Sequence, residues 1–337
     1  MRAFITAVFT ESALELLEKR GITTIYKPWN KTKKVLSEFE LLDVIDEKRI
    51  DILIVEFENV SDDVIKNSDL KIIAICRNDP KRNIDIEAAN ERGIPVIYTP
   101  GRNANAVAEH TINLILTTLR KVVLADRLLR SGAIHIENFE KFIEFYEILR
   151  GRELLGKTVG IIGLGKIGFR VARKLRSFGV RILVYDPYVS DSKIRCVGGK
   201  RVDLDYLLRN SDIVTIHVPP TSKTIDLIGR NEIEKMKPTA ILINAASSVV
   251  VDEDALFDAI KEGKIAGAAL DVSTEEPIDS SNMFLRFDNV VLTPHIGGAT
   301  FETINLQSHM VAYDILRILD GKKPKFLYNP EVWKNEF

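Results

Sequence analysis

The chain has 337 residues and a formal net charge of −1, with 45% hydrophobic and 28% charged residues. These values predict a globular protein, and the length favours two domains. Basic and acidic residues balance, which argues against nucleic acid or an anionic membrane as a partner, and no apolar run is long enough to span a bilayer. Two cysteines, Cys76 and Cys196, make no disulfide framework, so a cytoplasmic location is expected.

Residues 1–100 alternate between strand-like runs and amphipathic helical stretches. The runs are "AFITAVF", "TTIYKP", "DILIVEF", "KIIAIC" and "PVIYTP". Such alternation predicts a parallel sheet with crossover helices, and Pro100 and Gly101 end it.

Helical periodicity then continues through one long stretch, residues 105–132, which ends at a glycine. Beyond it, Ile136, Phe139, Ile143 and Tyr146 share one face of a further helical stretch. This apolar face predicts a packed arm or a subunit contact. A site that stacks an aromatic ligand is the alternative.

A second alternating block contains six strand-like runs: "TVGIIGLG", "RILVYDP", "DIVTIHVP", "AILINAA", "IAGAALDV" and "VVLTPH". Six strands separated by helices match a doubly wound dinucleotide-binding domain. A last helical stretch, residues 301–321, follows the sixth run. If this stretch crosses back to the first domain, that domain is discontinuous.

The segment "GIIGLGKIG" contains Gly163-x-Gly165-x-x-Gly168 between a strand-like run and a helical stretch, which is the context of a dinucleotide site. Gly163 permits the tight turn, Gly165 lets the backbone approach a pyrophosphate, and Gly168 lets the helix pack closely. The amides near Lys166 and Ile167 then face the phosphates. The alternative is a glycine turn without a ligand.

Asp186 ends the next run, "VYDPY", at about the distance expected for the acid that binds the adenosine ribose. A carboxylate there repels a 2′-phosphate, and no arginine directly follows it. NAD is therefore preferred to NADP. If the glycine loop is empty, Asp186 is simply a turn residue before Pro187.

His295 and Glu276 follow the last two runs, in "VLTPHIGG" and "LDVSTEEP". A carboxylate beside an imidazole fixes its tautomer. Such a pair can take a proton from an alcohol as hydride leaves its carbon, and can protonate a carbonyl in the reverse direction. Spacing alone does not pair the two residues, and a lone histidine is more often structural.

Several ordered motifs together closely resemble the D-isomer-specific 2-hydroxyacid dehydrogenases, which include phosphoglycerate, glycerate and lactate-type members. The motifs are "GIIGLGKIG", "VYDPY", "IHVPPTSKT", "INAASSVVVDEDAL", "AALDVSTEEP" and "VLTPHIGGAT". The resemblance implies an α/β protein with two doubly wound domains and a cleft between them. Residues 1–100 with 301–337 would form a flavodoxin-like substrate domain, and residues 101–300 a Rossmann NAD-binding domain. It also implies a homodimer.

The resemblance implies roles for single residues as well. His295 becomes the acid–base, Glu276 its partner and Asp186 the ribose ligand. NAD is the expected cofactor, and a 2-hydroxy or 2-oxo acid is the expected substrate. The residues expected along the cofactor are Gly163, Gly165, Lys166, Ile167 and Gly168 at the pyrophosphate, His217, Val218 and Pro219 on the adenosine side, and Ala245, Ala246, Ser247, Asp271, His295 and Gly298 on the nicotinamide side.

The chain departs from the family at Ser247 and Ser248. The family segment reads Ile-Asn-x-x-Arg-Gly, and its arginine, which clamps the substrate's carboxylate, aligns with Ser247. A serine cannot make the bidentate, charge-assisted contact of a guanidinium. We expect its absence to weaken binding or catalysis by about ten- to a hundred-fold at least.

A second departure lies in "CRNDPKRNID", where many members carry a glycine-bearing loop whose amides bind the substrate. Asn78 stands in this loop, Asp79 would repel an anion, and Pro80 has no amide hydrogen. The hypothetical replacement cations are Arg77, Arg82 and Arg102.

Three functions remain open. The His295–Glu276 pair favours an NAD-dependent dehydrogenase with an unusual substrate or a relocated cation. Ser247 favours an NAD(H)-binding sensor or scaffold with reduced or no turnover. The two serines can also form a phosphate-accepting site. The chain has no Cys-x-x-Cys, His-Glu-x-x-His or Gly-x-Ser-x-Gly, so we expect neither a metal centre nor a serine hydrolase.

Overall fold

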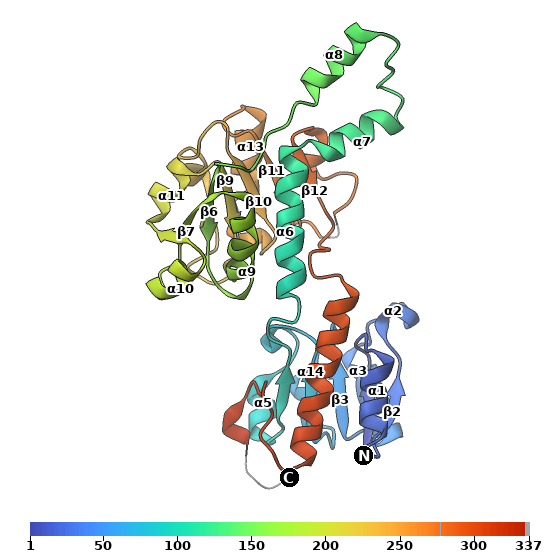
Figure 1. Cartoon of the computed structure of the whole chain (residues 1–337). Helices are drawn as coiled ribbons and strands as arrows, with labels where there is room; N and C mark the ends of the chain where they lie inside the picture. The colour runs from blue at the N-terminus through green and yellow to red at the C-terminus, as the bar shows by residue number, and fades with distance from the viewer. Residues whose placement is uncertain (277, 334–337) are drawn as a thin grey trace. The chain divides into compact units, whose positions relative to one another are not determined.

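The computed structural model describes residues 1–276 and 278–333, and the chain divides into two compact units. Unit 1 consists of Met1–Arg102 and the described residues from Thr300 onward, whereas unit 2 is Asn103–Ala299. In Figure 1 the red helix α14 (Phe301–Leu319) therefore lies among the blue elements of unit 1. Among the described residues, no helix combines the length and the apolar character that a membrane crossing requires.

Unit 1 is built on a five-stranded parallel sheet with the order β2-β1-β3-β4-β5. This is the flavodoxin-like order, so that part of the predicted fold class is confirmed. Alternate side chains of β1 enter opposite cores. Ala3 and Ile5 pack with α1 and α14, whereas Phe4 packs with α3, α4 and α5.

The strands of unit 1 are β1 (Arg2–Ile5), β2 (Thr23–Tyr26), β3 (Ile52–Val55), β4 (Ile72–Ile75) and β5 (Val96–Tyr98). Its helices are α1 (Glu11–Glu18), α2 (Trp29–Thr32), α3 (Glu38–Lys48), α4 (Asp62–Lys66), η1 (Pro80–Arg82), α5 (Ile86–Glu91), α14 (Phe301–Leu319) and η5 (Pro330–Val332).

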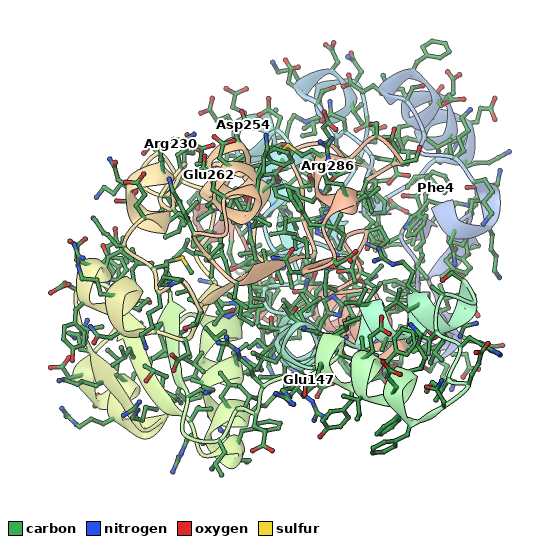
Figure 2. The ribbon with its side chains drawn as sticks, turned by 90° about the horizontal axis from the view of Figure 1, so that it is seen from above. Phe4, Glu147, Arg230, Asp254, Glu262 and Arg286 are labelled. Carbon is green, nitrogen blue, oxygen red and sulfur yellow. The ribbon has the colours of Figure 1, made fainter. Side chains whose placement is uncertain are left out.

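Unit 2 contains a seven-stranded parallel sheet with the order β12-β11-β10-β9-β6-β7-β8. When the strands are numbered along the chain from β6, they follow the Rossmann order, with one more strand at the far edge. This confirms the second half of the predicted fold class. Helices α6 and α9 cover one face of the sheet, and α11, α12 and α13 cover the other. Charged side chains near α13, such as Arg230, Asp254 and Glu262, point away from the ribbon into solvent (Figure 2).

The strands of unit 2 are β6 (Thr158–Ile162), β7 (Arg181–Tyr185), β8 (Gly199–Arg201), β9 (Ile213–Ile216), β10 (Ile241–Asn244), β11 (Gly267–Leu270) and β12 (Val290–Leu292). Its helices are α6 (Ala104–Leu119), α7 (Val122–Arg130), α8 (Phe139–Ile148), α9 (Lys166–Leu175), η2 (Arg176–Phe178), α10 (Asp191–Cys196), α11 (Leu204–Asn210), α12 (Arg230–Ile233), η3 (Ser248–Val250), α13 (Glu253–Lys261) and η4 (Met283–Arg286).

Unit 2 differs from the sequence prediction at two elements. The six expected strands become seven, because the short polar segment Gly199–Arg201 pairs with β7 as an edge strand. The single long helix expected over residues 105–132 is two helices, since the backbone of Lys121 adopts the left-handed conformation (φ 53°) between α6 and α7. Figure 1 shows α7 and α8 extending away from the sheet of unit 2.

The strand before Ser247 ends earlier than its apolar letters predict. Strand β10 stops at Asn244 rather than at Ala246 because the Asn244 side chain takes over the hydrogen bonding of the turn. Its Nδ2 donates to the carbonyl of Ser247 (2.9 Å), and its Oδ1 accepts from the amide of Ala246 (3.1 Å). Asp252 then caps α13 by accepting from the amide of Ala255 (2.9 Å).

Candidate active site

His295 and Glu276 lie in the loops after β12 and β11, which are neighbouring strands of the same parallel sheet. The structure brings the two side chains together. Nδ1 of His295 lies 3.0 Å and 3.1 Å from the two carboxylate oxygens of Glu276. With Nδ1–H donated to the carboxylate, the lone pair of a neutral imidazole is on Nε2, which has no hydrogen-bond partner among the described residues. The pair is 62% and 39% exposed and can exchange a proton at Nε2.

Asp271 holds the loop that carries His295. It is 2% exposed, and its carboxylate accepts from the amides of Ile296 (2.9 Å) and Gly297 (2.8 Å) and from the hydroxyl of Thr293 (2.6 Å). Burial alone raises the pKa of the Asp271 carboxyl, but hydrogen bonds from His110, Thr293 and the two amides hold that pKa below its usual range. The role of Asp271 near the nicotinamide carboxamide remains a prediction.

The backbone of His295 is itself unusual. Its φ of 54° lies in the left-handed region, which costs a residue other than glycine on the order of 1 kcal/mol or more. Gly297 two positions later cannot be replaced freely, since a Cβ there would lie 2.7 Å from Oδ2 of Asp271. A Cβ on Gly298 would likewise lie 2.9 Å from Nδ2 of Asn103.

Glu253, in the first turn of α13, holds the loop that leads to Glu276. Its carboxylate accepts from the amide (3.0 Å) and hydroxyl (2.7 Å) of Thr274 and from the hydroxyl of Ser273 (3.1 Å). The amide of Ser273 in turn donates to Glu276 (3.4 Å). The backbone around Glu276 is therefore tied to the start of a helix.

The glycine loop joins β6 to α9 in the shape that a dinucleotide requires. Gly163 has a φ of 89°, and a Cβ on Gly168 would lie 2.1 Å from the carbonyl oxygen of Gly163. A Cβ on Gly165 would meet nothing within 4 Å, and no side chain caps the helix that begins at Lys166. The backbone beside Gly165 is thus open to a ligand at the positive end of the helix, which fits a pyrophosphate.

Asp186 ties the glycine loop to the end of the neighbouring strand β7. Its carboxylate accepts from the amides of Leu164 (2.7 Å), Tyr188 (2.8 Å) and Val189 (3.1 Å). A carboxylate offers about four acceptor positions, so one remains for a ribose hydroxyl. Arg201 of β8 donates to the carbonyls of Asp186 and Val189 and pairs with Asp191, which engages its guanidinium within this loop.

The segment His217–Pro219 lies against the glycine loop. A Cβ on Gly163 would lie 2.8 Å from both the carbonyl oxygen of His217 and Cγ1 of Val218. Burial lowers the pKa of His217 to about 3, so its ring is neutral. Nε2 contacts the hydroxyl of Thr215 (3.0 Å), whereas the buried Nδ1 has no hydrogen-bond partner among the described residues. An unpartnered polar atom at this loop also fits a ligand.

Ala245, Ala246 and Ser247 follow β10 at the sheet edge where the loops of Glu276 and His295 begin. Ala245 is buried, and the other two are half-buried. No side chain bonds to the hydroxyl of Ser247 in the described part of the chain. The position at which the resemblance leads us to expect a guanidinium therefore presents a neutral hydroxyl.

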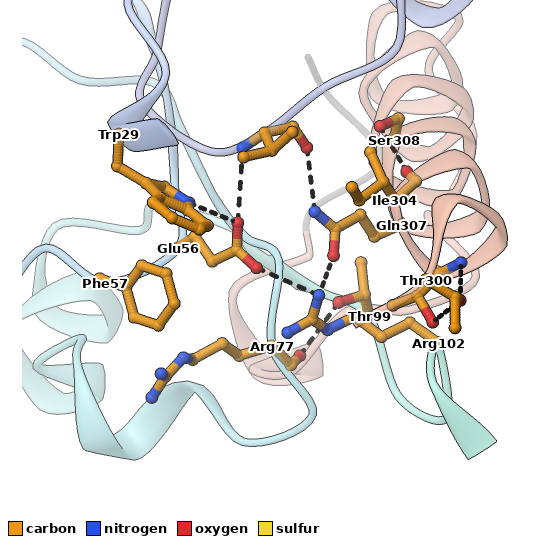
Figure 3. A network of polar contacts seen from close by, with 12 residues as sticks. Trp29, Glu56, Phe57, Arg77, Thr99, Arg102, Thr300, Ile304, Gln307 and Ser308 are labelled. Carbon is orange, nitrogen blue, oxygen red and sulfur yellow. Dashed lines mark hydrogen bonds and ion pairs between the residues drawn. The ribbon is translucent and has the colours of Figure 1, made fainter. Parts of the chain in front are cut away.

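The candidate substrate residues Asn78 and Arg102 lie in unit 1. Arg102 pairs with Glu56 (Nη1–Oε1 3.1 Å) and donates to Gln307, and Glu56 also accepts from Nε1 of Trp29 (3.0 Å), as Figure 3 shows. Asn78 accepts from the amide of Gly101 (2.6 Å). These contacts hold the ends of β3, β4 and β5 together.

Arg77 differs from Arg102 in having no carboxylate partner within the described residues. Its guanidinium lies 4.8 Å from the ring centroid of Phe57, and Nη1 donates to Asn83 (3.3 Å). Burial and the neighbouring charge of Arg102 lower the pKa of Arg77. An arginine whose pKa is lowered in this way still stays charged at neutral pH. Arg77 is therefore a cation that no acid among the described residues neutralises by contact.

Comparison with known proteins decides the family. Residues 112–297 match the model described as D-isomer specific 2-hydroxyacid dehydrogenase, NAD binding domain. The chain belongs to this family. Its cofactor is NAD, and the residues of unit 2 described above fit that cofactor.

Two relatives of this chain are named as two different enzymes, a phosphoglycerate dehydrogenase and a glyoxylate reductase. The D-3-phosphoglycerate dehydrogenase of Archaeoglobus fulgidus is 37% identical over 341 residues, which cover 100% of this chain and 61% of that enzyme. The chain thus spans less than two thirds of that relative. The glyoxylate reductase of Thermofilum pendens is 46% identical over 253 residues, which cover 75% of this chain and 73% of the reductase. A crystal structure from Thermus thermophilus matches with a TM-score of 0.85 and 31% identity, over 97% of this chain and 100% of that chain.

The predicted cofactor residues lie together at the carboxyl ends of the strands of unit 2. Sequence reasoning missed His110, Glu253 and Arg201, which contact the loops of His295, Glu276 and Asp186. Only Glu253 carried a signal, because an acid in the first turn of a helix next to the motif was visible in "VVVDEDAL".

Proposed function

We propose that the chain is an NAD-dependent oxidoreductase that interconverts a D-2-hydroxy acid and a 2-oxo acid of the phosphoglycerate or glycerate/glyoxylate type. The observation that carries the proposal is the contact of His295 with Glu276 at the end of a dinucleotide-binding sheet. A protein that only binds NAD has no need of this pair. The relatives named phosphoglycerate dehydrogenase and glyoxylate reductase support the substrate class.

The proton chemistry follows from the orientation of His295. NAD supplies the hydride acceptor, or NADH the donor, when bound. Nε2 of His295 takes the proton of the substrate hydroxyl in oxidation and returns it to the carbonyl oxygen in reduction. Glu276 stabilises the imidazolium formed in oxidation and keeps Nε2 as the exchanging atom. Asp271 and Glu253 hold the two loops so that this contact persists.

We further propose that Arg77 of unit 1 supplies a cation for the substrate's anionic group. Two features of Arg77 support this: it lacks a carboxylate partner, and it is held by Phe57 and Asn83. Arg102 is a weaker candidate because Glu56 already neutralises it. Asn78 is bonded to Gly101 and serves to shape the loop.

The decisive experiment follows NADH oxidation with glyoxylate, hydroxypyruvate, pyruvate and phosphohydroxypyruvate, with NADH binding measured separately by fluorescence. Wild type should turn over at least one acid. Arg77→Met should raise KM by about tenfold or more, the loss of one charge-assisted contact, and leave NADH affinity unchanged. Lys81→Met, an exposed cation in the same loop region, serves as the control and should behave as wild type. Equal KM values in the two variants would remove Arg77 from the site.

The second candidate function is an NAD(H)-binding sensor or scaffold with reduced or no turnover, and the neutral hydroxyl of Ser247 favours it. Tight NADH binding without turnover of any of the four acids would establish this alternative. Activity gained on Ser247→Arg would then identify the substitution that silences the site.

We also propose a homodimer formed through the arm, defined as residues 122–148. Its exposed apolar side chains are Val122, Val123, Leu129, Ile136, Phe139, Phe142, Ile143, Tyr146 and Ile148. The ring of Phe142 lies 6.0 Å from that of Phe139 and 5.9 Å from that of Tyr146. A cluster of exposed aromatic rings of this kind marks an interaction site, and the family resemblance implies a second copy as the occupant.

Light scattering tests the arm proposal. Wild type should have the mass of a dimer and Phe142→Asp that of a monomer. Phe39→Asp, which changes an exposed phenylalanine of unit 1, is the matched control and should remain dimeric. A monomeric wild type, or a dimeric Phe142→Asp variant, contradicts the proposal.

A further inference from the structure

His110 lies on α6 beneath the loop that carries His295. Helix α6 packs against β11 and β12, the two strands that lead into the loops of Asp271 and His295. The side chain of His110 is 13% exposed. Its Nε2 lies 3.1 Å from the hydroxyl of Thr293 and 3.2 Å from Oδ1 of Asp271. The mechanism proposed above does not use this imidazole.

The hydrogen bonds around His110 have a single consistent direction. Thr293 has one hydroxyl hydrogen, which it donates to Oδ1 of Asp271 at 2.6 Å. Towards His110, the Thr293 oxygen can therefore act only as an acceptor. Nε2 of His110 must then carry a hydrogen, shared between Thr293 and Asp271.

Asp271 transmits this contact to the backbone on the far side of His295. Its two oxygens accept from the amides of Ile296 and Gly297, the residues that directly follow His295. On the near side, the amide of His295 donates to the carbonyl of Thr293 (3.0 Å). His295 is thus fixed before and after its strained backbone position by groups that meet at His110.

We infer that His110 is a positioning residue for His295, acting through Asp271 and Thr293. It touches neither the proposed proton-exchanging atom nor the glycine loop. Its N–H donor keeps the Asp271 carboxylate and the Thr293 hydroxyl in the orientation that holds Ile296 and Gly297. The inference rests on the proposed role of His295 as the acid–base, and it adds a residue of α6 to that site.

Two substitutions separate the donor from the bulk of the side chain. His110→Leu fills the space beneath the loop but has no N–H, whereas His110→Gln keeps a donor near the position of Nε2. Asn113→Leu, at an exposed position of the same helix, is the control. NADH affinity, kcat and KM, and hydrogen exchange at the amides of Ile296 and Gly297 are measured for each variant.

We expect His110→Leu to lower kcat on the order of a hundredfold, as a small displacement of a catalytic group does, with KM and NADH affinity within about twofold. The amides of Ile296 and Gly297 should exchange faster. His110→Gln should recover most of kcat and of the amide protection, and Asn113→Leu should match wild type. A fall in thermal stability with unchanged kcat would show a merely structural role and overturn the inference, as would a glutamine variant no better than leucine.

The exchange measurement keeps the test independent of the proposed function. If wild type turns over none of the acids, the proposed function fails, but faster exchange in His110→Leu that glutamine reverses still establishes the positioning of the loop. Unchanged exchange at Ile296 and Gly297 overturns the inference whatever the activity.

Discussion

The loops at the carboxyl ends of the two sheets are held by partly different chemistry. In unit 2, buried carboxylates accept hydrogen bonds from backbone amides: Asp186 fixes the glycine loop, and Asp271 fixes the loop of His295. In unit 1, Glu56 and Glu58 likewise accept from backbone amides, but a buried ion pair is added, with Arg102 between Glu56 and Gln307. An amide donor is present at almost any residue, so one acid sets the shape of each loop in unit 2. The loops of unit 1 depend on several side chains of matched charge.

This contrast predicts where substitutions act on chemistry and where they act on stability. In unit 2 the acids position reacting or binding groups, so their loss should appear first in catalysis and in its pH dependence. In unit 1 the loss of one partner leaves a buried charge, so stability should fall first. The predictions below test each side of the contrast in order of expected effect.

The largest effect should come from His295→Asn, which removes the proposed proton acceptor. We expect kcat to fall about 10²- to 10⁴-fold, a far larger change than in NADH affinity, because the side chain is proposed to exchange a proton and only borders the expected nicotinamide site. Glu276→Gln should cost less, since the imidazole remains. Steady-state kinetics beside NADH titration measure both. An asparagine variant that keeps more than half of kcat would remove His295 from the reaction.

Arg102→Met should produce the largest loss of stability. Glu56 is 5% exposed and would be left without its cation, which costs about 3 kcal/mol. The double variant Glu56→Gln, Arg102→Met should recover part of this loss because it removes both charges. Urea unfolding gives the free energies, with Lys19→Met, one half of an exposed ion pair, as the control within about 0.5 kcal/mol. A double variant less stable than the single one would show that the charge is not the cause.

Asp271→Asn should destabilise unit 2 by about 2 kcal/mol at neutral pH, since the carboxylate has charge-assisted bonds that an amide cannot replace. The pKa of Asp271 is lowered in the folded state, so its contribution is complete above the ordinary pKa of 3.8 and is lost as pH falls through the lower folded value. The stability curves of wild type and variant should therefore converge in acid. Parallel curves from pH 7 to pH 3 would contradict this.

His217→Gln should have the smallest effect. It should be visible only as a change in the slope of the free energy of unfolding against pH. The folded pKa of His217 is about 3, below the ordinary 6.5, so the unfolded chain binds a proton that the folded chain does not. Between pH 6.5 and pH 5.5, protonation of His217 in the unfolded chain should lower the free energy of unfolding of wild type by about 1 kcal/mol. The variant should not show this decrease. Identical pH profiles would mean that water reaches the His217 ring.

Most of the fold could be predicted from periodicity, because both sheets are covered on two faces and their central strands are apolar and buried. Strand β8 escaped prediction since Gly199–Arg201 is short, polar and paired on one side only. The break between α6 and α7 was hidden because Arg120 and Lys121 favour helices, and only tertiary packing turns the chain there.

The candidate site divides in the same way. Residues proposed to touch a ligand lie in motifs, so His295, Glu276 and the glycine loop could be proposed from the sequence alone. Residues that act on other residues could not. His110 meets Thr293 across 183 positions of sequence, and their contact exists only because α6 packs beneath β11 and β12. No local pattern in "AVAEHT" announces it.

The return of α14 to unit 1 sets an order on synthesis. Val311, Ala312, Ile315 and Ile318 belong to the same core as Ala3 and Ile5. A ribosome must therefore complete all of unit 2 before the last helix of unit 1 emerges. Until then, one face of the sheet formed by the first hundred residues is partly uncovered. By that time all strands of unit 2 have been synthesised. Unit 2 can therefore fold before the core of unit 1 is complete.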